Sequence, residues 1–213
     1  HNLPTDNEEF FPSIDYQFLK ADCPVQRINH HYAHALSCWP VNDTRPDVEV
    51  VIDGEGDLNH AWSVFKNMRL IERGYETESG SIGQEMTKSG MWLNIEYDDR
   101  SGYDISGKLM GLQSYGNHVQ EFVDFLPDNI YETHGIFDRQ RWFDYVGDEL
   151  IGSLRPLDWI RTVHNHMGDV LVKFFERITD KNYDSVITYS GGVAQNVIWN
   201  TKLKNKFPNL IIP

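Results

Sequence analysis

The sequence predicts a mixed α/β (α+β) fold, and three regions carry this prediction. Residues 48–75 contain mostly apolar runs at 49–52, 60–65 and 68–75, separated by short turns, which is typical of a β-meander. Residues 156–179 place apolar side chains at a period of about 3.6, which predicts one long helix with a buried face. Residues 183–212 show the pattern of a strand, a Ser-Gly-Gly turn, a helix and a strand, so they predict a βαβ unit.

Composition excludes several classes of function. The 213 residues carry a formal net charge of −13 at pH 7, and no run of Lys and Arg occurs. Because nucleic-acid binding needs clustered cations, nucleic acid is not an expected partner. No apolar run reaches the roughly 20 residues that cross a bilayer, and the two cysteines, Cys23 and Cys38, form no CxxC pair. These features predict a cytoplasmic protein without membrane contact or a disulfide scaffold.

In chain order, the sequence divides into four predicted parts. Residues 1–25 are rich in Pro, Asp, Glu and aromatic side chains without a period, which indicates an irregular lead-in. Residues 26–116 hold a histidine cluster and the β-meander. Residues 117–154 mix acidic and aromatic side chains and predict an insertion or small helical lobe with a solvated acidic face. Residues 155–213 combine the long helix with the βαβ unit.

A cluster of histidines follows Asn29, whose short polar side chain suits the N-cap of a helix. In such a helix His30 and His34 stand at i and i+4 on one face. Two imidazoles at this spacing suit a divalent metal, and Asp53, which follows the apolar run at 49–52, is a candidate third ligand. Paired histidines also occur on solvated helix faces and in packed cores, so the spacing alone leaves both interpretations open.

Four motifs follow one another along the chain. They are His-His-Tyr-Ala-His-Ala at 30–35, Asp-Gly-Glu-Gly at 53–56, Gly-Lys-Leu-Met-Gly-Leu-Gln-Ser-Tyr-Gly at 107–116 and Ser-Gly-Gly-Val-Ala-Gln-Asn at 190–196. This series resembles the O-carbamoyltransferases of the nodulation and antibiotic-tailoring type. That family shows His-His-x-x-His-Ala, Asp-Gly-x-Gly, Gly-Lys-x-Met-Gly-Leu-Ala-x-Tyr-Gly and Ser-Gly-Gly-Val-Ala-x-Asn in the same order.

The resemblance implies a fold and a reaction. The fold would be that of actin, sugar kinases and heat-shock-protein ATPases (the ASKHA, ribonuclease H-like fold). The reaction would use ATP and carbamoyl phosphate to form a carbamoyladenylate, whose carbamoyl group passes to a hydroxyl of an acceptor molecule or sugar. The expected cofactors are a divalent metal such as Fe²⁺ or Mn²⁺ in the protein, and Mg²⁺ with ATP.

The resemblance also implies roles for individual residues. It places the metal on His30, His34 and Asp53. His31, which is turned about 100° from its neighbour on the helix, becomes a proton shuttle or phosphate contact. Lys108 becomes a catalytic point charge for phosphate or adenylate. The nucleotide or carbamoyladenylate is expected to contact the backbone or side chains of Asp53, Gly54, Gly56, Lys108, Gly111, Gly191, Gly192 and Asn196.

Two parts of the family's fold are not recognised in this sequence. One is a phosphate-binding hairpin before the histidine helix, and the other is a metal-binding aspartate after the last strand. We therefore expect an interior segment of the fold, which a further polypeptide segment completes. Two alternative functions stay open: a tRNA threonylcarbamoyladenosine-type transferase, which the acidity disfavours, and a non-catalytic nucleotide-binding subunit. The residues do not indicate the acceptor.

Overall fold

A computed structural model gives the fold of the chain. It describes residues 28–41, 45–76, 80–93, 95–96, 104–138, 141–142, 144 and 153–213. The predicted lead-in at 1–25 lies outside the described residues, as does part of the predicted insertion at 117–154. Among the described residues, no helix is both long enough and apolar enough to span a bilayer.

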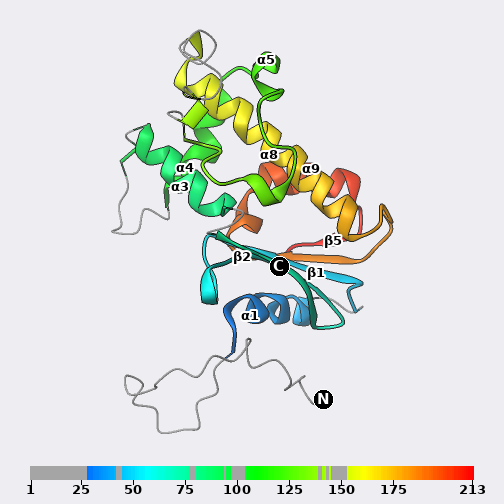
Figure 1. The fold of residues 1–213 in the computed structure, drawn as a ribbon. Coiled ribbons are helices and arrows are strands. Elements are labelled where there is room, and N and C mark those ends of the chain that lie inside the picture. Colours follow the sequence, from blue (N-terminus) through cyan, green and yellow to red (C-terminus); the bar gives the residue numbers. More distant parts are fainter. Residues whose placement is uncertain are drawn as a thin grey trace, which may run out of the picture.

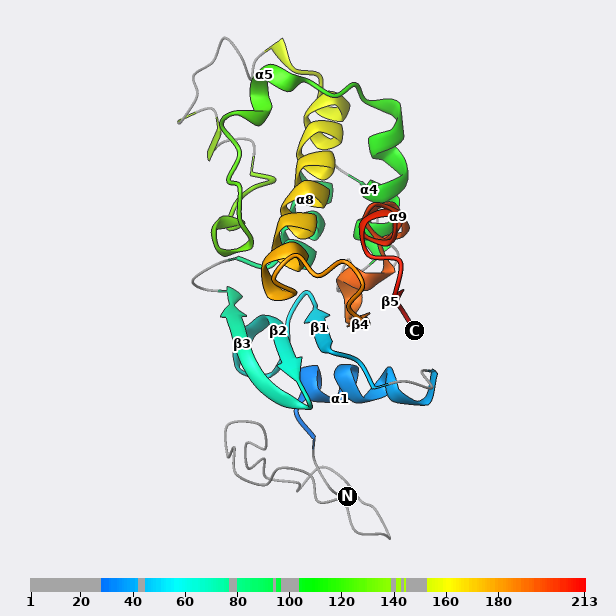
Figure 2. The same ribbon diagram turned by 90° about the vertical axis from the view of Figure 1, so that its right-hand side faces the viewer.

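A five-stranded mixed sheet forms the middle layer (Figures 1 and 2). Its order is β3-β2-β1-β4-β5. The first three strands form the predicted meander, with β2 antiparallel to both β1 and β3. The last two strands belong to the predicted βαβ unit and run parallel to β1. The strands are β1 (Val48–Ile52), β2 (His60–Lys66), β3 (Arg69–Tyr75), β4 (Ile187–Ser190) and β5 (Leu210–Ile211).

The central strand β1 determines where a ligand can bind. All five of its residues are buried, because helices cover both faces of the sheet. It runs parallel to β4, with Val51 opposite Ser190. Since the carboxyl ends of parallel neighbours meet at one edge of a sheet, Asp53 after β1 comes to lie beside Gly191 and Gly192 after β4. The predicted metal ligand and the predicted glycine turn therefore share one edge.

Helix α1 (His30–Ser37) covers one face of the sheet, as both ribbon views show. The side chain of Asn29 accepts a hydrogen bond from the backbone N–H of Tyr32 at 3.1 Å, so the predicted N-cap is confirmed. The inner face of the helix and the strands below it share a small core, which consists of Tyr32, Ala35, Val51, Phe65 and Met68.

Helices α8 (Pro156–Ile178) and α9 (Val197–Lys206) cover the opposite face. The long helix predicted at 156–179 is α8, and its apolar stripe forms the main core with the sheet. The remaining described helical segments pack around this layer. They are α3 (Ile82–Trp92), α4 (Asp104–Leu112), α5 (Gln120–Val123) and the short 3₁₀ helices η2 (Trp39–Val41), η3 (Asp57–Asn59), η4 (Gln113–Tyr115), η5 (Ile130–Glu132) and η6 (Gly192–Gln195).

The described part of the predicted insertion packs firmly against α8. The ring of Phe122 lies 4.7 Å from that of Trp159 and 5.7 Å from that of Trp142, between ring centroids. The backbone N–H of Asn117 donates to Asp158 at 2.7 Å, which ties the start of this region to the first turn of α8. The aromatic residues of the insertion thus extend the main core instead of forming a second one.

Three local features differ from the sequence prediction. Strand β4 begins at Ile187 instead of residue 183, because a turn in which Asn182 accepts the N–H of Asp184 precedes it. The helix expected from 193 to 206 is interrupted at Asn196, so that η6 and α9 are separate. The glycine-flanked motif at 107–116 is mostly helical, because α4 continues to Leu112 and η4 follows it.

Candidate metal centre and nucleotide cleft

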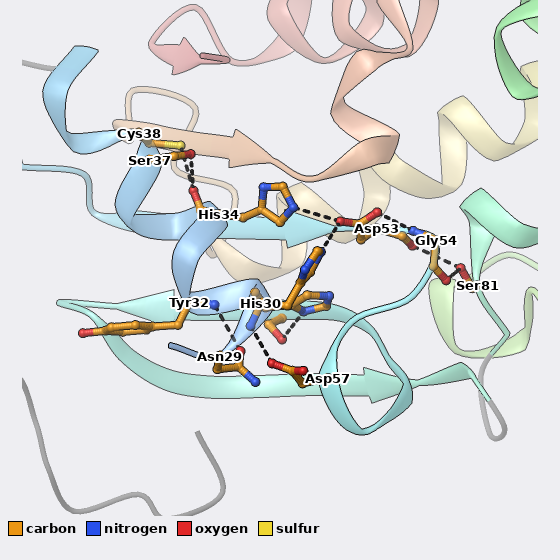
Figure 3. Close-up of polar contacts among 12 residues, drawn as sticks. Asn29, His30, Tyr32, His34, Ser37, Cys38, Asp53, Gly54, Asp57 and Ser81 are labelled. Atoms are coloured by element: carbon orange, nitrogen blue, oxygen red, sulfur yellow. Dashed lines mark hydrogen bonds and ion pairs between the residues drawn. The ribbon is translucent and has the colours of Figure 1, made fainter. Parts of the chain in front are cut away.

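Three predicted metal ligands meet at the end of β1 (Figure 3). The Nε2 atoms of His30 and His34 each lie 3.0 Å from Oδ2 of Asp53. Each of the three side chains offers one ligand atom, and these three atoms all lie within 4.8 Å of one another. Two imidazole nitrogens and a carboxylate oxygen form a donor set that suits zinc, iron or manganese. The residues therefore fit a divalent metal.

The surroundings of Asp53 favour its ionised form. Burial acts to raise its pKa, but hydrogen bonds from His34, His30 and the backbone N–H of Gly54 outweigh burial and hold the pKa well below its usual range. The Gly54 N–H donates to Oδ1 at 2.7 Å, which leaves Oδ2 directed at the two histidines. A negatively charged carboxylate is the form that a metal requires.

The backbone around this centre is also fixed. The N–H of His30 donates to Oδ2 of Asp57 at 2.8 Å, a bond that joins the start of α1 to the turn after β1. The hydroxyl of Ser81 donates to the carbonyl oxygens of Asp53, at 3.1 Å, and Gly54, at 2.5 Å. The loop that carries Asp53 is thus anchored on both sides.

His31 does not face this centre. Its side chain is fully buried below α1, and its Nδ1 lies 2.7 Å from the hydroxyl of Ser63 on β2. Burial lowers the pKa of His31 to about 3, so the ring is neutral near pH 7. Gly56, another predicted ligand contact, packs against the same ring, since a Cβ atom there would lie 2.5 Å from Nε2. The geometry gives His31 a packing role and does not support a proton shuttle.

A partly open cleft of about 1020 Å³ begins at this centre and runs towards α3 and α4. It contains five of the residues expected from the family resemblance: His30, Asp53, Gly54, Gly192 and Asn196. The other lining residues come from the turn after β1, from α3 and α4, and from the turn and helix after β4; they are Glu55, Gly83, Gln84, Met86, Thr87, Lys88, Asp104, Ser106, Gly107, Met110, Val193, Gln195 and Trp199.

The two glycines after β4, Gly191 and Gly192, have different structural roles. Gly191 has a φ of +95°, and a Cβ atom there would lie 2.3 Å from the carbonyl oxygen of Ile52. It is needed for the turn itself and does not line the cleft. A Cβ atom on Gly192 would lie 2.8 Å from Oδ1 of Asp53. Gly192 therefore leaves room for the carboxylate. Because 3₁₀ helix η6 follows these glycines, the expected N-terminus of a long helix is not at this turn.

Lys108 and Gly111 lie outside this cleft. Both line a separate shallow pocket of about 540 Å³ on α4 and η4. The amine of Lys108 lies 2.7 Å from Asp104 and donates to the carbonyl oxygen of Glu96 at 2.5 Å. These two contacts hold the lysine on helix α4, in the pocket that it shares with Gly111. The structure does not bring these two predicted residues to the site.

One wall of the cleft is predictable from the sequence and another is not. The Ser-Ile-Gly turn at 81–83 and the helical run after it predict a segment that shapes the cleft, and Gln84 and Lys88 of α3, one turn apart, do line it. Trp199, on α9, also lines the cleft. No signal indicated Trp199, because an aromatic residue in a predicted amphipathic helix is normally part of the core.

His164 and His166, on α8, are both buried and both have partners. Nε2 of His166 lies 2.8 Å from the carbonyl oxygen of Pro127, and Nε2 of His164 lies 3.0 Å from Nδ2 of Asn196. Burial, followed by the charges of Arg161 and Lys202, lowers the pKa of His164 from 6.5 to about 4. The folded protein thus keeps His164 neutral where an unfolded chain would protonate it.

This pKa shift predicts acid destabilisation. Because the folded-state pKa of His164 is depressed, its contribution to stability is complete above pH 6.5 and is lost as the pH falls towards 4. We expect the free energy of unfolding to drop by about 3 kcal/mol from this group between pH 7 and pH 4. Urea unfolding of the unmodified protein and of His164→Gln at pH 7 and pH 4 measures this drop. The variant has no imidazole at this position that could be protonated, so it should lack the contribution of His164. An equal drop in both proteins would contradict the assignment.

Comparison with known proteins gives the fold class. No protein-family model matches this sequence. Among solved structures, the chain is similar to the activator of the 2-hydroxyisocaproyl-CoA dehydratase from Clostridium difficile with bound ADPNP. The TM-score is 0.50 at 14% sequence identity, and the match covers 86% of this chain and 58% of that chain. The chain thus spans little more than half the length of the structure it matches.

This similarity shows that the chain has an ASKHA-type α/β fold with a mixed five-stranded sheet, as the sequence predicts. At 14% identity it concerns the fold alone. The activator's structure holds ADPNP, an analogue of ATP.

Proposed function

We propose that the protein is an ATP-dependent O-carbamoyltransferase that takes a carbamoyl group from carbamoyl phosphate, through a carbamoyladenylate, to an acceptor hydroxyl. The observation that carries this proposal is the group of His30, His34 and Asp53 at the end of a cleft whose lining includes His30, Asp53, Gly54 and Gly192. These residues belong to three of the four motifs that resemble that family. The cleft thus joins motif residues that lie far apart in the chain.

The charges in the cleft favour a phosphate-containing ligand that binds together with a cation. Apart from histidine, the charged residues among its described lining are Asp53, Glu55, Asp104 and Lys88. The carboxylates outnumber the single amine, so a triphosphate would be repelled unless a cation enters with it. A divalent metal held by His30, His34 and Asp53 would neutralise phosphate charge and polarise the bond that reacts.

The chain's own residues would orient the nucleotide. The turn at Gly192 and the Gly54 loop both border the cleft beside Asp53, where a ligand can approach the backbone. In the proposed reaction, water first hydrolyses carbamoyl phosphate to carbamate and inorganic phosphate. An oxygen of the carbamate then attacks the α-phosphorus of ATP, and pyrophosphate leaves. The acceptor hydroxyl then attacks the carbamoyl carbon, loses its proton to solvent or a base, and displaces AMP. Inorganic phosphate is the remaining product of carbamoyl phosphate.

Product analysis with labelled ATP tests the proposal. With carbamoyl phosphate present, we expect AMP and pyrophosphate, and without it no AMP above background. Formation of ADP and phosphate regardless of carbamoyl phosphate would show a simple ATPase and overturn the proposal. Binding of an ATP analogue without any turnover, even with carbamoyl phosphate and a panel of hydroxylated acceptors, would favour a nucleotide-binding subunit.

A pair of lysine variants tests the location of the nucleotide. Lys88 and Lys108 lie on the neighbouring helices α3 and α4, and each forms an ion pair with a carboxylate of its own helix, at 3.2 Å and 2.7 Å. Only Lys88 lines the cleft. We expect Lys88→Met to weaken binding of an ATP analogue about tenfold by calorimetry, because a charge-assisted contact is lost.

Lys108→Met is the matched control, and we expect its affinity for the ATP analogue to change less than about twofold. If Lys108→Met loses more affinity for the ATP analogue than Lys88→Met does, Lys108 has the role that the family resemblance implies. Equal losses would place the nucleotide outside this cleft.

A further inference from the structure

The side-chain amide of Asn196 has a defined orientation. Its Oδ1 accepts hydrogen bonds from the backbone N–H groups of Ile198 and Trp199, both at 3.2 Å, and so caps α9. Backbone N–H groups can only donate, so the oxygen must face the helix and Nδ2 must face the other way. Nδ2 lies 3.0 Å from Nε2 of His164. Asn196 also lines the cleft. Within the part of the chain that the structure describes, His164 is the acceptor for one of its two amide hydrogens, which leaves the other for a ligand.

This orientation determines the state of His164. Because Nδ2 of Asn196 donates, Nε2 of His164 must be the acceptor, and the proton of the neutral ring must be on Nδ1. His164 is fully buried, and its Nδ1 has no hydrogen-bond partner among the described residues. A buried donor without a partner is costly, and the contacts of His164 with Asn196 and Trp199 offset part of this cost.

His164 also contacts Trp199, an aromatic residue of the cleft lining. Its ring stacks on the indole of Trp199, with ring centroids 4.7 Å apart and planes inclined by 24°. The indole Nε1–H donates to the backbone carbonyl oxygen of His164 at 2.8 Å. One residue of α8 therefore contacts two neighbouring lining residues of the cleft, Asn196 and Trp199, although it is not itself part of the lining.

We propose that His164 is a positioning residue that holds Asn196 as a pure hydrogen-bond donor towards the ligand. The amide oxygen of Asn196 is hydrogen-bonded to α9, and one of its amide hydrogens is hydrogen-bonded to His164. Asn196 can therefore donate one hydrogen bond to a ligand in the cleft but cannot accept one. It therefore selects a ligand atom that accepts, such as a sugar or phosphate oxygen or an unprotonated ring nitrogen of a nucleotide. The identity of the ligand as a nucleotide rests on the proposed function.

Two substitutions of His164 separate positioning from packing. His164→Gln keeps an acceptor at the place of Nε2, whereas His164→Leu keeps the volume and removes the acceptor. We expect His164→Leu to bind an ATP analogue about tenfold more weakly and His164→Gln to bind it within about twofold of the unmodified protein. His166→Leu, which deletes a buried histidine hydrogen bond on the same helix away from the cleft, is the control and should bind normally.

Nitrogen NMR of labelled histidine provides a test that does not depend on nucleotide binding. We expect His164 to be the neutral tautomer protonated on Nδ1, with Nε2 as the acceptor. Protonation on Nε2 would overturn the proposal even if the nucleotide binds. If the unmodified protein shows the expected tautomer but no affinity for the ATP analogue, the proposed function fails and the positioning of Asn196 stands. If it binds the analogue and His164→Leu binds equally well, the positioning role is wrong.

Discussion

Replacing His30 or His34 with alanine is expected to remove the divalent metal, with a loss of affinity of about 100-fold or more. Each substitution deletes one of the three candidate ligand atoms that lie within 4.8 Å of one another. Two remaining ligands hold a divalent ion poorly, and Asp53 also loses one of its hydrogen bonds. Elemental analysis of the purified protein, followed by titration with Fe²⁺, Mn²⁺ and Zn²⁺, measures the effect.

The fold should survive both substitutions. The Asn29 cap and the bond from the backbone N–H of His30 to Asp57 do not involve the imidazole rings. His118→Ala is a suitable control, because this histidine is exposed, pairs with Gln120 at 3.2 Å and lies outside the cleft. If both site variants keep as much metal as this control, the histidines serve only as hydrogen-bond partners of Asp53 and the metal centre does not exist.

Replacing Gly192 with alanine is expected to impair metal and nucleotide binding together. The added Cβ atom would lie 2.8 Å from Oδ1 of Asp53, closer than a methyl carbon can approach. The carboxylate would have to turn, which breaks its bond with the Gly54 N–H and moves Oδ2 away from the two imidazoles. We expect both affinities to fall about tenfold or more, as when a supporting contact of a metal ligand is lost.

The control for this variant is Gly107→Ala, because Gly107 also lines the cleft but an added Cβ there would meet no atom within 4 Å from the other described residues, apart from its chain neighbours and the backbone of its own helix. Metal analysis, calorimetry with an ATP analogue and circular dichroism should be run on both variants. Loss of nucleotide affinity with full metal content in Gly192→Ala would show that Asp53 can adjust and that the glycine matters only for the ligand. If Gly192→Ala binds metal and nucleotide as tightly as the unmodified protein, the close contact between Gly192 and Asp53 is contradicted.

Much of the fold is predictable from local patterns. The β-meander, the long helix at 156–178 and the parallel strands around 187 and 210 follow from periodicity, because each pattern matches the geometry of one element. The metal group is predictable for a similar reason: His30 and His34 are one helical turn apart, and Asp53 ends a buried strand. These local patterns made the three residues candidates, and the family resemblance favoured the metal over a solvated or packed histidine pair.

The tertiary structure decided which other residues reach the cleft. Lys88 and Lys108 are both helical lysines with an acidic neighbour, but only the packing of α3 and α4 determines which amine faces the cleft. Likewise, Gly191 and Gly192 are adjacent, yet one serves the turn and the other makes room for Asp53. Sequence periodicity determines the face of an element on which a side chain lies. Which partner that face meets depends on contacts between segments far apart in the chain, and these form only when the layers pack.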